Sequence, residues 1–104
     1  MRLRVLLEAE DEIQGAAHHY AAKDEELGAD FVDAAQTAME DARKDPERYA
    51  IVDAVRGVKG VRRHSLRRFP YEVIYKAYEN EVLVIAVAHF YRKPGYWRRR
   101  LVRR

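Results

Sequence analysis

The sequence predicts an α+β protein in which a helical hairpin packs on a small, mainly antiparallel sheet. Three observations predict it: an alternating apolar segment at the N-terminus, two consecutive segments with helical apolar spacing, and three later segments rich in β-branched and aromatic residues. The expected order of elements is therefore β-α-α-β-β-β. A length of 104 residues suits one modest core, so we expect residues 1–104 to form a single domain.

The first strand and first helix are expected within the first 28 residues. Residues 2–7 alternate before becoming apolar, which is typical of a strand. The acidic run at residues 8–12 suits a helix N-terminus, where carboxylates meet the positive end of the helix dipole. Gly28 is expected to end this helix as a C-terminal cap. Its apolar face would carry Ile13, Ala16, Ala17 and Tyr20.

A second helix is expected after Asp30, whose side chain can cap it. The basic residues Arg43 and Lys44 suit its C-terminal end, and Pro46 would stop it. Its small apolar side chains would let it approach the first helix closely, which predicts a helical hairpin. The apolar stripe has regular helical spacing and comprises Phe31, Ala34, Ala35, Ala38, Met39 and Ala42.

The second half of the chain predicts a three-strand meander. We expect a loop over residues 46–60, then strands over 61–69, 71–78 and 82–90, with a tight turn at 79–81. The last strand is almost wholly apolar, as expected for a strand covered on both faces. Strict alternation would place Leu83, Ile85, Val87, His89 and Tyr91 on one face and Val84, Ala86, Ala88 and Phe90 on the other.

Charge is divided sharply along the chain. Residues 1–55 hold 14 acidic and 6 basic side chains, a net charge of −8, whereas residues 56–104 hold 3 acidic and 14 basic ones, a net charge of +11. Such a basic half predicts a surface for a polyanion or for an acidic protein partner. Arginines that merely solvate the surface are the simpler alternative.

Several classes of site and location are disfavoured by composition. The chain has no cysteine, no apolar run near the length of a membrane span and no signal-peptide pattern, so we expect a cytoplasmic protein that does not enter a membrane. His18 and His19 are neighbours on a helix and point about 100° apart, which does not suit a shared metal. With no glycine-rich phosphate loop either, we expect neither a metal nor a cofactor.

Candidate functional side chains gather in the basic half. Cleavage of RNA needs a base, an acid and cations that stabilise the phosphate. A histidine side chain can change its charge near neutral pH, so His89 could serve as acid or base, although a structural hydrogen bond at a strand end is the favoured interpretation for this residue alone. The candidates for a nuclease are Arg62, Arg63, His89, Tyr91 and Arg92. The candidates for binding nucleic acid or a target are Arg67, Arg68, Tyr71, Arg98, Arg99 and Arg100.

Two segments carry a resemblance to a known family. Residues 62–75 contain the pattern FPY-x-x-x-Y, and residues 86–97 read AVAHFYRKPGYW. Together they resemble the RelE/ParE superfamily of toxins from type II toxin–antitoxin modules, often described as plasmid stabilisation proteins. The resemblance implies the fold expected above, a growth-inhibiting activity, and a cognate acidic antitoxin that neutralises the toxin in a hetero-oligomer.

The superfamily has two branches with different targets. The RelE-like branch cleaves messenger RNA on the ribosome, and the ParE-like branch inhibits DNA gyrase. Family members often carry arginine just before the Val-Ile-Tyr of the strand, where this chain has Glu72, and an acid there would repel phosphate. The ending with His89 and Trp97 is closer to ParE-like members, so we favour gyrase, with the ribosome-dependent endonuclease as the alternative. A non-toxic basic module that binds nucleic acid or protein is a second alternative.

Overall fold

A five-stranded mixed sheet and two long helices form the framework of the computed structural model, which describes residues 1–53 and 55–102. The elements in chain order are β1 (Arg2–Val5), α1 (Leu7–Ala21), α2 (Glu25–Lys44), β2 (Ala50–Ile51), β3 (Val61–Ser65), β4 (Tyr71–Ala77), β5 (Glu81–His89) and α3 (Arg98–Val102). The expected α+β class and the helical hairpin are confirmed. The short strand β2 and the C-terminal helix α3 were not expected.

The strands are ordered β1-β5-β4-β3-β2. The pairs β2–β3, β3–β4 and β4–β5 are antiparallel, which confirms the meander, and β1 pairs with β5 in parallel. A hairpin of helices carries the chain from β1 across the sheet, so β1 can lie beside the last strand. Strand β2 is only two residues long and forms the outer edge beside β3.

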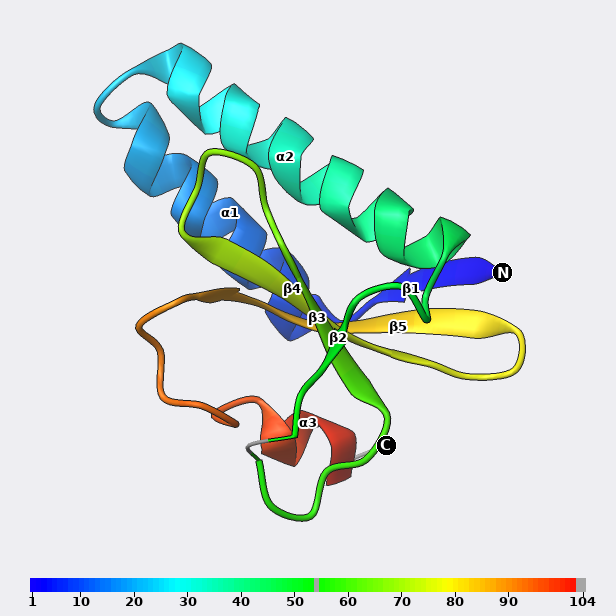
Figure 1. Cartoon of the computed structure of the whole chain (residues 1–104). Helices are drawn as coiled ribbons and strands as arrows, with labels where there is room; N and C mark the ends of the chain where they lie inside the picture. Colours follow the sequence, from blue (N-terminus) through cyan, green and yellow to red (C-terminus); the bar gives the residue numbers. More distant parts are fainter. Residues whose placement is uncertain (54, 103–104) are drawn as a thin grey trace.

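The two faces of the sheet carry different cores. Helices α1 and α2 cover one face, and the chain after β5 folds under the other face and ends in α3 (Figure 1). The helix-side core includes Phe31, Val73, Tyr75, Val84 and Val87. The C-terminal core comprises Val55, Val61, Ile74, Leu83, Ile85, Ala86, Ala88 and Trp97. Trp97 thus anchors the C-terminal segment, residues 90–102, to this face of the sheet.

The turn between the two helices lies earlier than expected. Helix α1 ends at Ala21, and Asp24 caps α2 by accepting a hydrogen bond from the Glu26 N–H at 3.0 Å. The expected cap roles of Gly28 and Asp30 are therefore wrong, because both residues lie inside α2. A Cβ atom on Gly28 would lie 2.7 Å from the Ala21 Cβ. Because Gly28 has no side chain, the two helices can approach each other closely at this point.

Two strands are shorter than the alternation of the sequence predicts. Strand β1 ends at Val5, and the next residues begin α1. Strand β3 ends at Ser65 rather than at Phe69, because the chain turns through residues 66–70 with Arg68 at a φ of 71°. Phe69 still packs in the helix-side core, which explains its apolar character.

A β-bulge changes the facing of side chains in β5. Tyr75 pairs with Val84 and Ile74 pairs with Ala86, so Ile85 is an extra residue without a partner in β4. One extra residue reverses the alternation beyond it. Val87 therefore joins the helix-side core whereas Leu83 belongs to the C-terminal core. The expected single face containing both residues is wrong.

Candidate target-binding surface and polar pocket

The end of β5 exposes two aromatic side chains. Phe90 and Tyr91 directly follow the strand, with 49% and 91% of their surfaces exposed. The Phe90 N–H donates to the Pro70 carbonyl at 2.9 Å, which fixes the backbone at this point. Lys93 is also exposed in this segment. The arrangement exposes aromatic and cationic groups side by side on the surface.

His89 is held in place by its neighbours. Its Nδ1 accepts a hydrogen bond from the Tyr91 N–H at 3.1 Å, so the neutral ring carries its proton on Nε2. The Tyr71 ring meets it edge-on with a centroid separation of 5.0 Å. Burial raises the pKa of Tyr71, with the nearby Tyr20 adding to the effect, so Tyr71 stays a neutral phenol. Tyr71 of β4 and His89 of β5 lie directly opposite one another in the sheet.

The two adjacent arginines of β3 face opposite sides of the sheet. Arg62 pairs with Tyr75 of the helix-side core, and Arg63 pairs with Ile74 of the C-terminal core. The Arg62 guanidinium donates to the carbonyls of Glu47 and Tyr49 at 3.1 and 2.7 Å. Arg62 therefore ties the segment before β2 to the sheet and lies apart from Arg63.

A narrow cleft lies between β4 and the segment that follows β5. The cleft has a volume of about 160 Å³, and Arg63, His89 and Arg92 line it together. Glu72 also lines this cleft, with its Oε1 4.0 Å from the Arg63 Nε and its side chain only 19% exposed. Burial raises the pKa of Glu72, and the charge of Arg63 opposes that rise. The structure thus places an acid beside Arg63, one of the candidate phosphate-binding residues.

The turn after β3 holds Arg67 and Arg68 in different surroundings. The Arg68 Nη1 donates to the Asp30 Oδ2 of α2 at 3.2 Å, and its guanidinium lies 5.6 Å from the centre of the Phe69 ring. Arg67 instead lines a polar pocket between α2 and β3.

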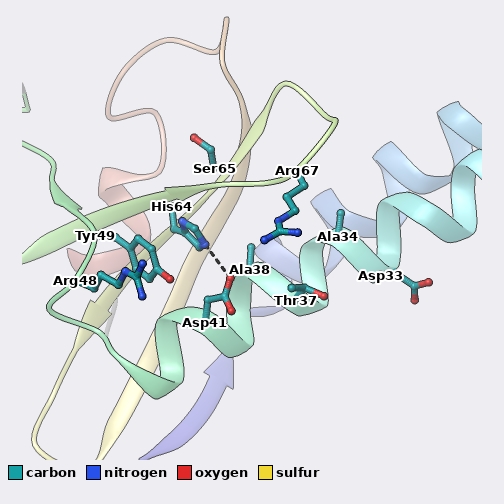
Figure 2. A pocket seen from close by; sticks show the side chains of 10 residues that line it. All are labelled: Asp33, Ala34, Thr37, Ala38, Asp41, Arg48, Tyr49, His64, Ser65 and Arg67. Carbon is teal, nitrogen blue, oxygen red and sulfur yellow. Dashed lines mark hydrogen bonds and ion pairs between the residues drawn. The ribbon is translucent and has the colours of Figure 1, made fainter.

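That pocket, with a volume of about 490 Å³, brings His64 together with Asp41 and Tyr49, two neighbours that the sequence did not reveal (Figure 2). The His64 Nε2 lies 3.1 Å from the Asp41 Oδ2, and the Tyr49 ring stacks on the imidazole at 3.7 Å between centroids. Arg48 and Thr37 also line it. Asp41 and His64 are 23 residues apart, so no local motif reveals them. The His64–Asp41 contact and the stacking fasten α2 to β3 and to the segment before β2.

The arginines of the C-terminal segment have unlike roles. The Arg92 guanidinium lies 3.8 Å from the centre of the Tyr96 ring, and the Arg98 Nη1 donates to the Arg56 carbonyl at 3.3 Å. Arg99 is exposed. Arg100 points inward, with 14% of its side chain exposed, and forms an ion pair at 2.9 Å with Glu12 of α1. Glu12 was not among the predicted functional residues.

Within the described part of the chain, no group of three or more histidine or acidic side chains could hold a metal ion. Nor does any helix of residues 1–53 and 55–102 combine the length and the apolar character that a membrane crossing requires.

The sequence and the fold are similar to those of known proteins. A family model described as the ParE toxin of the type II toxin–antitoxin system, parDE, matches residues 3–94. No curated protein matches the sequence significantly. One similar solved structure is a chain of the chromosomal ParDE toxin–antitoxin system from P. aeruginosa, with a TM-score of 0.72 and 18% identity. The match covers 86% of this chain and 95% of that chain, which shows a shared fold.

Proposed function

The chain belongs to the ParE toxin family of type II toxin–antitoxin systems, and from that premise we propose that it arrests growth by inhibiting DNA gyrase. We propose that residues 1–104 act as one toxin domain in the cytoplasm. The contact surface would be the C-terminal surface, which we define as Phe90, Tyr91, Arg92, Lys93, Arg98 and Arg99. Aromatic residues and arginine dominate the binding energy of many protein interfaces, and Tyr91 is almost fully exposed in the free chain.

The cleft beside that surface favours gyrase over RNA as the target. A phosphodiester bound beside Arg63 in this cleft would meet the carboxylate of Glu72, whose Oε1 lies 4.0 Å from the Arg63 Nε. An unprotonated acid at that position repels phosphate. Arg62 is engaged by two backbone carbonyls on the other face. The proposal rests on Glu72, the single observation that most disfavours an RNA-cleaving centre here.

We also propose an acidic antitoxin as the partner that neutralises the toxin in a hetero-oligomer. The half of the chain from residue 56 carries a net charge of +11, which an acidic segment would complement. Binding between such surfaces is weakened by salt because mobile ions screen the charges. Co-expression of the antitoxin should restore growth, and the complex should dissociate more readily as ionic strength rises.

Gyrase supercoiling by purified components tests the proposed target. Wild-type protein should inhibit supercoiling, and Tyr91→Ala should raise the concentration for half-inhibition roughly tenfold or more, the effect of losing one strong interface residue. Tyr78→Ala removes another exposed tyrosine, from the turn after β4, and serves as the matched control. Equal potency of the two variants would argue against the C-terminal surface.

Transcript analysis during induced expression separates the alternatives. Arrest with intact transcripts and lost supercoiling is the result expected from gyrase inhibition. Codon-phased cuts in messenger RNA that disappear in His89→Ala or Arg63→Ala would replace our proposal with the RelE-like endonuclease. Normal growth without the antitoxin would instead favour a non-toxic binding module.

A further inference from the structure

Glu12 of α1 connects three separate parts of the chain. Its Oε1 accepts hydrogen bonds from the Val87 N–H at 3.0 Å and from the Arg100 Nη1 at 2.9 Å. Its Oε2 accepts from the Tyr96 hydroxyl at 2.5 Å and from the Arg100 Nη2 at 3.1 Å. Both carboxylate oxygens therefore have two donors each, and α1, β5 and the C-terminal segment meet at one side chain.

The position of Glu12 follows from a gap in the sheet. Strand β1 pairs with β5 only as far as Val84, so within the described residues no strand lies beside β5 on that side beyond this point. Backbone groups left without a partner inside a protein are costly. Here Glu12 accepts from the Val87 N–H, and Arg100 donates to the Ile85 carbonyl at 3.0 Å. The ion pair thus replaces the missing strand along the bulged part of β5.

The pair is well shielded from water. Only 17% of the Glu12 side chain and 14% of the Arg100 side chain are exposed. The two guanidinium nitrogens of Arg100 contact separate oxygens of Glu12, a bidentate arrangement that is stronger and more directional than a single ion pair. Removal of one partner would leave the other charged and poorly solvated.

The network reaches the C-terminal surface through Tyr96. The Tyr96 hydroxyl is fixed by Glu12, and the Arg92 guanidinium lies over the Tyr96 ring at 3.8 Å. Trp97, the next residue, is buried in the C-terminal core. Arg92 and helix α3, which both contribute to the C-terminal surface, are therefore connected to Glu12.

We propose that Glu12 is a positioning residue for target inhibition, which through Arg100 and Tyr96 holds the C-terminal surface in its binding shape. This inference rests on the proposed function, because it assigns the target contact to that surface. Glu12 itself lies on α1 and contacts the backbone of β5 rather than the target. Its loss should loosen residues 92–102 and weaken inhibition together.

The first test compares Glu12→Gln with Glu10→Gln, an exposed acid in the same helix. Hydrogen exchange and limited trypsin cleavage report the order of residues 92–102 in the full-length protein. In Glu12→Gln, we expect the amide hydrogens of residues 92–102 to exchange at least tenfold faster than in the wild type. Trypsin should also cut at Arg98–Arg100 at least tenfold faster. The same variant should inhibit gyrase roughly tenfold less. Glu10→Gln should match the wild type in both measurements. A Glu12→Gln protein with wild-type inhibition would overturn the proposal.

General destabilisation is separated from positioning by further variants. Gly28→Ala disturbs the helix hairpin far from the C-terminal segment, and it should lower stability without loosening residues 92–102. Arg100→Gln should reproduce Glu12→Gln, the double variant should be little worse than either, and Arg100→Lys should recover part of the inhibition because it restores the charge. If the losses of inhibition added up in the double variant, or if Arg100→Lys recovered no inhibition, Glu12 and Arg100 would not act as a coupled pair.

The readouts keep this inference distinct from the proposed target. If the wild-type protein arrests growth but leaves gyrase unaffected, the gyrase proposal fails, and growth arrest replaces supercoiling as the measure of each variant. Reduced arrest with a loosened segment in Glu12→Gln would then support the positioning role. Unchanged arrest with a loosened segment would refute it.

Discussion

Glu72 illustrates how one acid alters the chemistry of a cationic cleft. It lies in β4 opposite Ser65 and Ala88 and lines the same cleft as Arg63 and Arg92. The carboxylate balances Arg63 at 4.0 Å. The cleft therefore has less attraction for phosphate than the basic composition of this half of the chain suggests.

The raised pKa of Glu72 predicts a pH-dependent stability effect. Burial favours the protonated carboxyl in the folded state, so the folded pKa lies above the ordinary value of 4.5. Below that value both states are protonated, and the effect vanishes; as pH rises through the folded pKa, the buried charge costs stability. Glu72→Gln should therefore be more stable than the wild type at pH 7, with the difference shrinking toward pH 4.

Urea unfolding of both proteins at the two pH values measures that difference. Glu79→Gln, in the exposed turn after β4, controls for the loss of one negative charge. If the stability of Glu72→Gln relative to the wild type did not increase between pH 4 and pH 7, the charge of Arg63 would fully offset the cost of burying the carboxylate.

Residues differ in how far the sequence reveals their roles. Glu72 stands out because it interrupts a recognisable pattern, and His89 and Tyr71 meet because they lie opposite one another in adjacent strands. Glu12 could not be found in this way. It is one of four acids within residues 8–12, and its partner Arg100 lies 88 residues later in the chain. Only the folded arrangement distinguishes it from its neighbours.

At the level of elements, the helices were predictable from their apolar stripes but their junction was not. Asp24 and Asp30 are both suitable caps, and a glycine between them suggests a helix end. Packing decides the matter, because Gly28 lies against α1 where a larger residue would not fit. In the same way, the apolar run of β5 predicts a strand but contains no signal for the bulge at Ile85.

Two glycine substitutions test the close contact within the hairpin. A methyl group on Gly28 would lie 2.7 Å from the Ala21 Cβ and 2.8 Å from the Ala17 carbonyl oxygen, so Gly28→Ala should destabilise by about 1–3 kcal/mol. Apart from its chain neighbours and the nearby backbone of its own helix, no described atom lies within 4 Å of a methyl on Gly15 of α1, and Gly15→Ala should stabilise by roughly 0.5–1 kcal/mol. Urea denaturation gives both values, and a stabilising Gly28→Ala would disprove the packing argument.

At the scale of the molecule, the division of charge along the chain becomes a division in space. Both long helices come from the acidic half, and β3, β4, β5 and the C-terminal segment come from the basic half (Figure 1). Some of these cations contact other parts of the protein: Arg62 donates to the Tyr49 carbonyl, and Arg100 forms an ion pair with Glu12. Others, such as Lys93 and Arg99, remain exposed. The overall charge of +3 therefore understates the attraction of one side of the molecule for anions.

The exposed cations predict salt-sensitive binding of the isolated protein to nucleic acid. Each phosphate neutralised adds about 0.9 to the slope of log affinity against log salt concentration. A protein with both Lys93→Gln and Arg99→Gln should therefore bind duplex DNA more weakly at low salt, with a slope shallower by up to about 2. A protein with Arg4→Gln and Lys23→Gln loses the same charge from exposed positions in the acidic half, and its slope should stay close to that of the wild type. Fluorescence anisotropy over a salt series measures all three slopes. Equal slopes in the two variants would mean that net charge alone, rather than its placement at the C-terminal surface, governs the attraction.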